Sequence, residues 1–223
     1  VANYRLDHWE LDGFYIDPYN PLPVLMNRDH VLKAVFSPIP QFTLTISSSP
    51  SGVAFTADSA PHTTLWSGTY YEGTQISLVM PEVHAIGEAK YYWSQWSDGV
   101  TSRSRIVIMN TNITLTAYYT GPYYGLTVTS TPITGVTFTI NGVPKTTPFT
   151  EWLLEGSYTL EMPKTHNEYV WSHWQEDGDT NRIKIIILSG TTWTGVYVKA
   201  PPPKPVGGYS LQIEGYTTTE PLT

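Results

Sequence analysis

The sequence predicts an all-β protein built from repeated β-sandwiches, and two observations carry this prediction. The first is composition: Thr, Ser, Tyr, Val and Ile are abundant, whereas Gly and Pro recur between apolar runs. Residues of the first kind favour strands, and Gly and Pro mark turns. The second is an internal repeat, in which an aromatic residue precedes a Trp by five positions and Asp-Gly follows. Its three copies contain Tyr4 and Trp9, Tyr91 and Trp96, and Tyr169 and Trp174.

Each Trp motif is followed by an alternating run that ends in an aromatic residue, at residues 24–36, 105–119 and 182–198. Alternation of apolar and polar residues is typical of strands with one buried face. Each run is predicted to split into two strands at a polar break that has the chemistry of a turn. The three breaks are Asn27–Asp29, Asn110–Asn112 and Ser189–Thr191.

A further shared half precedes the second and third Trp motifs. It begins with an opening strand, FTLTIS from Phe42 and YGLTVTS from Tyr124. The same signature returns near the end of the chain as YSLQIEG, residues 209–215. Equivalent positions lie roughly eighty residues apart, a length that suits a seven-stranded immunoglobulin-like sandwich.

The repeat therefore predicts tandem immunoglobulin-like β-sandwich domains, with an incomplete N-terminal sandwich and a C-terminal donor strand. Residues 1–38 are the back half of one repeat, and residues 42–120 and 124–198 are two whole repeats. Residues 199–223 hold a Pro-rich linker, which includes APPPKPVGG, and then the opening strand of a further sandwich.

The third repeat contains the stretch LTVTSTPITGVTFTINGVPKTTP. This stretch resembles the core of the PEGA-type sandwich repeat. The matching residues are Ser130, Thr131, Pro132, Gly135, Val136, Ile140, Asn141, Gly142, Thr147 and Pro148. The second repeat departs from this core, since it has Ala57-Asp58-Ser59 where the third has Ile140-Asn141-Gly142.

The N-terminal stretches HWELDG and NPLPVLMNRDHVLKAVF resemble the repeat units of large archaeal surface proteins. Together the two resemblances imply a sandwich architecture and an extracellular location at the cell surface. Repeats of this kind serve as spacers, cell-wall modules or assembly units, so the resemblance leaves the function open between these roles.

The Trp motif is interpreted as core packing, with Trp96, Trp174, Tyr91 and Tyr169 as core residues. A Trp on a central strand fills a sandwich core, and its indole N–H needs one hydrogen-bond partner. Strict alternation places Tyr91, Trp93 and Gln95 on one face, and Tyr92, Ser94 and Trp96 on the other. The alternative interpretation is a carbohydrate-stacking platform, which needs two aromatic side chains on one exposed face.

Charge and motif content disfavour several function classes. The formal net charge is −7 and no basic residues cluster, so nucleic-acid binding is disfavoured. The chain has no cysteine, and no apolar run approaches the length of a membrane span. Nucleophile, phosphate-binding and dinucleotide-binding motifs are missing as well, so the prediction is that the protein is not an enzyme and uses no cofactor.

Two polar stretches are candidates for modification or metal binding. Asp177, Asp179 and Asn181 alternate like the start of a calcium loop, but no Glu closes such a loop, so a plain turn is favoured over calcium. Asn112 lies in Asn-Ile-Thr, an acceptor for N-glycosylation, for which a simple turn Asn is the alternative. The six His show no metal-ligand spacing, and no metal site is predicted.

The two incomplete ends complement one another, which leads to a functional hypothesis. Residues 1–38 lack an opening strand, and an unpaired strand edge is a template for another chain. We expect residues 209–223 of a neighbouring copy to complete the sheet, so that the copies form a head-to-tail extracellular filament. No membrane span is expected, and glycans are a possible further partner. The expected donor residues are Tyr209, Leu211 and Ile213, and the expected acceptor residues are Tyr4, Trp9, Leu32, Ala34 and Phe36.

Two other functions stay open at this point. The chain could be a fragment of a long repeat-containing surface stalk or surface-layer protein, because cutting a tandem array out of phase gives the same pattern. It could also be a secreted carbohydrate-binding or adhesive module, which would need an exposed aromatic strip.

Overall fold

The computed structural model describes residues 3–202, and the regular secondary structure of these residues is entirely β-strand, which confirms the predicted all-β fold. The described chain divides into two compact units. The first comprises residues 3–126, 150–157 and 187–191, and the second comprises residues 127–149, 158–186 and 192–202.

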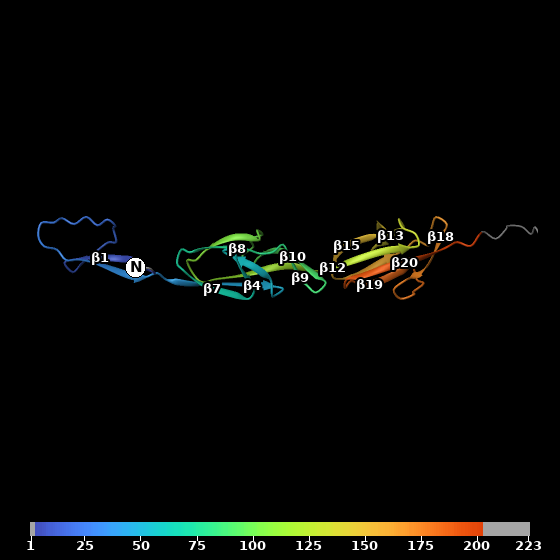
Figure 1. Cartoon of the computed structure of the whole chain (residues 1–223), viewed down its shortest axis with the longest axis horizontal. Helices are drawn as coiled ribbons and strands as arrows, with labels where there is room; N and C mark the ends of the chain where they lie inside the picture. Colours follow the sequence, from blue (N-terminus) through green and yellow to red (C-terminus); the bar gives the residue numbers. More distant parts are fainter. Residues whose placement is uncertain (1–2, 203–223) are drawn as a thin grey trace, which may run out of the picture. The chain divides into compact units, whose positions relative to one another are not determined.

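The first strands form a separate three-stranded antiparallel sheet in the order β2-β1-β3. These strands are β1 (Tyr4–Leu11), β2 (Phe14–Ile16) and β3 (Leu32–Pro38). Residues 17–31 contain no strand and form a wide loop beside the sheet (Figure 1). The predicted split of residues 24–36 into two strands is therefore wrong for its first half, because the described chain offers residues 24–26 no neighbouring strand.

A sandwich follows in the first unit. One of its sheets contains β4, β7, β9, β10 and the first part of β12, and the other has the order β11-β8-β5-β6. The strands are β4 (Gln41–Ser49), β5 (Ala54–Ala57), β6 (Ala60–Thr63), β7 (Trp66–Tyr71), β8 (Gln75–Val79), β9 (Val83–Ile86), β10 (Ala89–Trp96), β11 (Ser104–Ile108) and β12 (Ile113–Thr131).

The second sandwich repeats this plan. β12 continues without a break through the boundary expected near residue 120 and pairs with β15 and β20, and β17 and β18 extend the same sheet. The facing sheet has the order β14-β13-β16-β19. The strands are β13 (Thr137–Ile140), β14 (Val143–Thr146), β15 (Phe149–Leu154), β16 (Ser157–Glu161), β17 (Thr165–His166), β18 (Tyr169–Trp174), β19 (Ile183–Ile187) and β20 (Thr191–Lys199).

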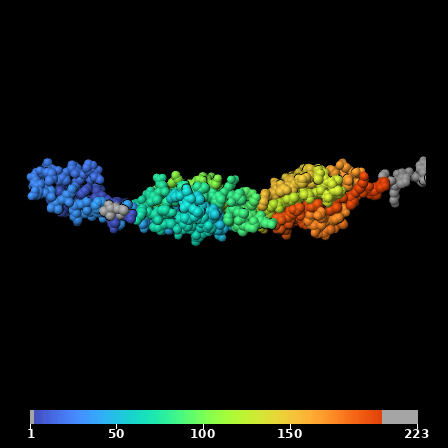
Figure 2. Space-filling model, in the orientation of Figure 1, coloured from blue at the N-terminus to red at the C-terminus, as the bar shows by residue number. Residues whose placement is uncertain are grey.

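Each sandwich has its own apolar core between its two sheets. In the first, Trp96 is fully buried among side chains that alternate along the strands, such as Leu44, Ile46, Ile76 and Met109. In the second, Trp174 is fully buried, as are Val128 and Leu160. The inward-facing residues of the two sheets interdigitate, as expected for a β-sandwich. Figure 2 shows the outer surface of the described chain, coloured by sequence as in Figure 1.

Strict alternation, predicted for residues 91–96, fails at one position. The register of β10 against β12 shifts between Trp93 and Gln95, which is a β-bulge. The extra residue brings Trp93 to the same face as Trp96, and the two rings meet edge to face with 5.4 Å between their centroids. Tyr91 packs against the same core.

Candidate functional site

The N-terminal sheet has the same strand register as the two complete sandwiches. Trp9 of β1 lies opposite Ala34 of β3, Trp96 lies opposite Ala117, and Trp174 lies opposite Gly195. In all three pairs the register shifts just before the Trp, between Leu6 and His8 in β1, so the bulge is repeated too. The three Trp residues are therefore structurally equivalent.

The three indole groups are also held by hydrogen bonds of the same kind. Each Nε1–H donates to a backbone carbonyl of the segment that follows the Asp-Gly turn. The acceptors are Tyr19 O for Trp9 at 2.9 Å, Ser102 O for Trp96 at 3.0 Å, and Asn181 O for Trp174 at 3.0 Å. Each indole N–H is thus satisfied by a backbone carbonyl with or without a second sheet, but the Tyr19 carbonyl lies beyond the additional strand β2, which has no counterpart after Trp96 or Trp174.

Burial is what distinguishes the N-terminal sheet. Trp96 and Trp174 have no exposed surface, whereas Trp9 is only partly buried. Leu32 is 44% exposed, whereas Leu115, its equivalent in the first sandwich, is 5% exposed. The same contrast holds for Phe36, which is 45% exposed, whereas its equivalents Tyr119 and Tyr197 are 9% and 1% exposed. Ala34 is partly buried, whereas Ala117 has no exposed surface. Tyr4 is 48% exposed.

Two missing neighbours explain this exposure. In the first sandwich the outer edge of β12 pairs in parallel with β4, which brings the buried Leu44 and Ile46 over the core. β3 occupies the place of β12, and within residues 3–202 no strand pairs with its outer edge. The second sheet is missing from the N-terminal part of the described chain as well.

The loop of residues 17–31 contains side chains that would belong to that second sheet. Val24-Leu25-Met26-Asn27 matches Val107-Ile108-Met109-Asn110 in sequence. Met109 is fully buried, but Met26 is 73% exposed. Our sequence-based list of acceptor residues did not include Met26, although the shared Met-Asn could have indicated it.

Polar contacts hold the open sheet and its loop in place. The carboxylate of Asp12, in the β1–β2 turn, accepts a hydrogen bond from Val31 N at 2.9 Å and lies 2.8 Å from His30 Nδ1 and 3.2 Å from Arg28 Nη2. The Val31 hydrogen bond, with the contribution of His30, lowers the pKa of Asp12 below its usual value. Glu10 on β1 pairs with Lys33 on β3 at 2.9 Å.

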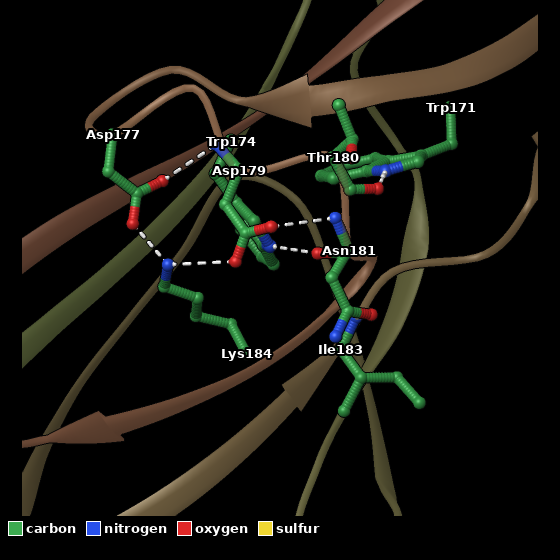
Figure 3. A network of polar contacts seen from close by, with 8 residues as sticks. All are labelled: Trp171, Trp174, Asp177, Asp179, Thr180, Asn181, Ile183 and Lys184. Carbon is green, nitrogen blue, oxygen red and sulfur yellow. Dashed lines mark hydrogen bonds and ion pairs between the residues drawn. The ribbon is translucent and has the colours of Figure 1, made fainter.

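In both complete sandwiches, a basic side chain forms an ion pair with the Asp of the Asp-Gly turn. Asp98 pairs with Arg105 at 2.8 Å, and this contact lowers the pKa of Asp98. In the second sandwich the Lys184 ammonium bridges the carboxylates of Asp177 and Asp179, which point toward it (Figure 3). The contact with Lys184 lowers the pKa of Asp177, and the contact with Asp177 raises the pKa of Lys184.

This network bears on the calcium alternative for residues 177–181. Lys184 already lies between the two carboxylates that a metal ion would need. The other oxygen of Asp179 accepts from Asn181 N, and Asn181 Oδ1 accepts from Ile183 N (Figure 3). Among the described residues there is no group of three or more acidic or His side chains suited to a metal ion. The geometry favours the plain turn, closed by an internal cation.

The remaining predicted residues lie in different places. Tyr91 and Tyr169 are partly buried on the strands that carry Trp96 and Trp174. Asn112 is exposed, and its Oδ1 accepts a hydrogen bond from Thr43 N at 2.8 Å. The donor residues Tyr209, Leu211 and Ile213 lie outside the described residues.

Comparison with known proteins adds a family match for the first complete sandwich. Residues 51–121 match the divergent InlB B-repeat domain. The match covers less than half of the chain, and it begins after the opening strand β4. The resemblance of residues 124–198 to PEGA-type repeats has no counterpart among the matches and stays a prediction. No curated protein matches the chain.

Several solved structures match this chain at low identity and low TM-score. GBS52, a minor pilin of Streptococcus agalactiae, is 12% identical, with 75% of this chain and 100% of that chain covered and a TM-score of 0.28. A C-terminal fragment of the pilus adhesin SpaC from Lactobacillus rhamnosus GG is 13% identical, with 74% and 99% covered and a TM-score of 0.27. The Bacillus anthracis TIE protein is 11% identical, with 75% and 36% covered and a TM-score of 0.28. Similarity this low implies nothing about shared function.

No described residue belongs to a helix with the length and apolar character needed to cross a membrane.

Proposed function

We propose that this chain is a structural subunit of a pilus-like extracellular fibre, in which residues 209–223 of one copy complete the N-terminal sheet of the next. One observation carries the proposal: Leu32 and Phe36 are exposed in the N-terminal sheet, whereas Leu115 and Tyr119 are buried at the same register positions of the first sandwich. The match of residues 51–121 to a repeat domain agrees with a protein built from tandem modules.

The first sandwich supplies a template for the register of the donor. There β4 runs parallel to β12, with Ile46 beside Leu115 and Ser47 beside Thr116. Leu32 and Lys33 are the equivalents of Leu115 and Thr116, because Ala34 and Ala117 both lie opposite a motif Trp.

Aligning YSLQIEG with FTLTIS transfers this register to the donor segment. Ile213 then lies beside Leu32, and Glu214 lies beside Lys33. Burial of each large donor side chain contributes about 1.5–3 kcal/mol, before the cost of ordering the segment. The charges of Glu214 and Lys33 are opposite, so the register also pairs them favourably.

Assembly is tested with the full chain and two doubly substituted variants. Leu211→Asp with Ile213→Asp places charges on the proposed buried face, whereas Ser210→Asp with Gln212→Asp places the same charges on the opposite face. Light scattering and negative-stain microscopy should show fibres for the parent and the second variant and monomers for the first. Monomers in all three samples would contradict the proposal and favour a stalk in which a covalently linked segment completes the sheet.

The register is tested by disulfide crosslinking, which is clean because the chain has no cysteine. Lys33→Cys with Glu214→Cys should give a ladder of covalent oligomers under oxidising conditions. Val35→Cys with Glu214→Cys, displaced by two residues on β3, is the matched control and should give little crosslinking. Fibres that crosslink only through the control pair would show a different register.

A further inference from the structure

Asp29, in the turn that precedes β3, occupies the position that Asn112 has in the first sandwich. Residues 26–32 align with residues 109–115 without a gap, and both stretches begin with Met-Asn. Each stretch ends at the Leu that lies two positions before the Ala opposite a motif Trp. The register of the two sheets therefore supports the same alignment as the sequence.

The turn in the second sandwich is one residue shorter. The Ala opposite the Trp follows Met26 by eight positions in the N-terminal sheet, and it follows Met109 by eight positions in the first sandwich. In the second sandwich, Gly195 follows the equivalent Leu188 by seven positions. The first sandwich is therefore the template for the N-terminal turn.

The two turns of equal length also share their backbone conformation. Asn27 N donates a hydrogen bond to Leu25 O at 3.0 Å, and Asn110 N donates one to Ile108 O at 3.1 Å. The chain bends at both of these Asn residues and at the residue after each. The next residue in each turn therefore starts from an equivalent place, although only the first sandwich has an opening strand beside it.

In the first sandwich, Asn112 closes one end of the parallel pairing between β4 and β12. The backbone pairing begins with Ile113 beside Leu44, so Thr43 N lies one residue beyond it. Asn112 Oδ1 accepts the hydrogen bond of that N–H at 2.8 Å. A backbone N–H that leaves water without an acceptor costs free energy, so Asn112 stabilises the start of the opening strand.

Asp29 presents a carboxylate oxygen where Asn112 presents its amide oxygen, on a side chain of the same length. Asp29 is exposed, and among the described residues its side chain makes no hydrogen bond or ion pair. The acceptor oxygens of Asp29 are thus available to a strand that pairs with β3.

We propose that the carboxylate of Asp29 accepts a hydrogen bond from Ser210 N of the donor segment and so fixes the start of the added strand. Aligning YSLQIEG with FTLTIS places Ser210 at the position of Thr43. The inference rests on the proposed fibre, and it names a donor-binding residue beyond the apolar face of the N-terminal sheet.

A carboxylate suits this place at an exposed strand end. Hydrogen bonds to an ionised acceptor are about twice as strong as those between neutral groups. Glu214 is the acidic residue of the paired donor stretch, and it lies four residues beyond Ser210, about 13 Å along an extended strand. Repulsion between Glu214 and Asp29 is therefore screened, because the Debye length at physiological salt is about 8 Å.

Binding is measured with the full chain carrying Leu211→Asp and Ile213→Asp, in which the proposed acceptor sheet is unchanged but the donor is disabled. The probe is a fluorescein-labelled peptide of residues 207–223, and fluorescence anisotropy gives its Kd. Adding Asp29→Ala to this parent should raise the Kd at least about tenfold, because the change removes an ionised acceptor.

Two further variants of the same parent serve as controls. Asp29→Asn restores the chemistry of Asn112 and should keep the Kd within about threefold of the parent. Asp17→Ala removes the same charge from the same loop and should leave the Kd unchanged. If circular dichroism shows that Asp29→Ala loses structure, Asp29→Ser, which favours the same turn but is too short to reach the strand, takes its place and should show the same loss.

A modified peptide isolates the hydrogen bond itself. An ester in place of the Tyr209–Ser210 amide removes Ser210 N–H and keeps every side chain. The ester should weaken binding to the parent, but it should have little further effect on Asp29→Ala, because both changes remove the same bond.

Two results would overturn the Asp29 contact and leave the fibre proposal standing. One is equal binding of the peptide by the parent and by Asp29→Ala. The other is an ester effect that is as large in Asp29→Ala as in the parent. Failure of the unmodified peptide to bind the parent would overturn both proposals together.

Discussion

At the scale of single residues, the three motif Trp residues share their backbone position but differ in how far their side chains are buried. They are Trp9, Trp96 and Trp174. All three donate an indole hydrogen bond to a backbone carbonyl beyond the Asp-Gly turn, and all three sit at the same register position. Only the two in complete sandwiches are fully buried. The contribution of each Trp to the free energy of unfolding should therefore depend on how deeply its side chain is buried, although all three belong to the same sequence motif.

Replacing these residues by Ala tests that expectation. Trp96→Ala and Trp174→Ala should each lower the free energy of unfolding of their sandwich by about 3–5 kcal/mol, since each leaves a large cavity. Trp9→Ala should cost distinctly less in chains that carry Leu211→Asp and Ile213→Asp. Urea unfolding followed by circular dichroism measures the three values, and an equal loss at Trp9 would mean that the N-terminal sheet is already covered.

A second residue-scale prediction concerns the cation in the Asp177 turn. Lys184→Met removes the charge that lowers the pKa of Asp177, so that pKa should rise toward its usual value. The pKa of Asp179 should rise less, because its largest influence is the hydrogen bond from Asn181 N. Carboxyl-carbon NMR titration measures both, with Lys145→Met as a control that should shift neither.

At the scale of elements, the two β-hairpins reach the same turn with different residues. Asn141 and Gly142 join β13 to β14, and Asp58 and Ser59 join β5 to β6, all with positive φ. Asn141 and Asp58 also accept equivalent hydrogen bonds, from Thr159 N and Ser77 N. The side-chain contact allows Asp58 to replace Asn141, but Ser59 at a φ of 68° occupies a conformation that suits glycine.

Ser59→Gly should therefore stabilise the first sandwich, by up to about 1 kcal/mol. Gly142→Ala, at a φ of 80°, should destabilise the second by about as much. Urea unfolding midpoints give both values. A loss of stability with Ser59→Gly would mean that the extra chain entropy of glycine outweighs the relief of strain.

The elements also show how far the sequence alone leads. The Trp motif and the alternating runs predict the Trp strands β10 and β18 and the strands that follow them, because the apolar–polar alternation of these segments is clear. The bulge before Trp96 was not predictable, since Ser94 carries no residue-type signal for an extra residue in a strand. Residues 24–26 have the sequence of a strand but not its structure, because a strand forms only beside a neighbour.

At the candidate site, too, some features could be predicted from the sequence and others required the structure. Tyr4, Trp9, Leu32, Ala34 and Phe36 could be assigned to one face from the repeat alone. Their exposure required the structure, since it depends on what packs above them. The ion pairs of Lys184 and Arg105 could not be read from the sequence, because both side chains reach back across seven residues to the turn before their strand.

At the scale of the whole molecule, groups with shifted pKa values define a pH window of stability. Asp12, Asp98 and Asp177 have lowered pKa values, so their contribution is full above about pH 4 and is lost as the pH falls through those values. Burial raises the pKa of Tyr119 and Tyr197, so their contribution is full below about pH 10 and is lost as the pH rises further.

The melting temperature should thus be nearly constant between about pH 5 and pH 9 and fall on both sides. Scanning calorimetry over pH 2–12 measures the profile. Combining Tyr119→Phe with Tyr197→Phe removes the two phenols and should move the alkaline fall to higher pH, although each change also removes a hydrogen bond to Pro81 O or Pro163 O. An alkaline fall that is unchanged in this variant would assign it to other groups.

The bridge that Lys184 forms between Asp177 and Asp179 has a consequence for the surroundings in which the chain folds. A calcium ion in such a turn would exchange with the medium, and a chelator or dilution would strip it away. The ammonium group of Lys184 is tethered a few residues from both carboxylates, so its local concentration does not depend on the medium. Fresh water and mineral-rich water should therefore support this turn equally well.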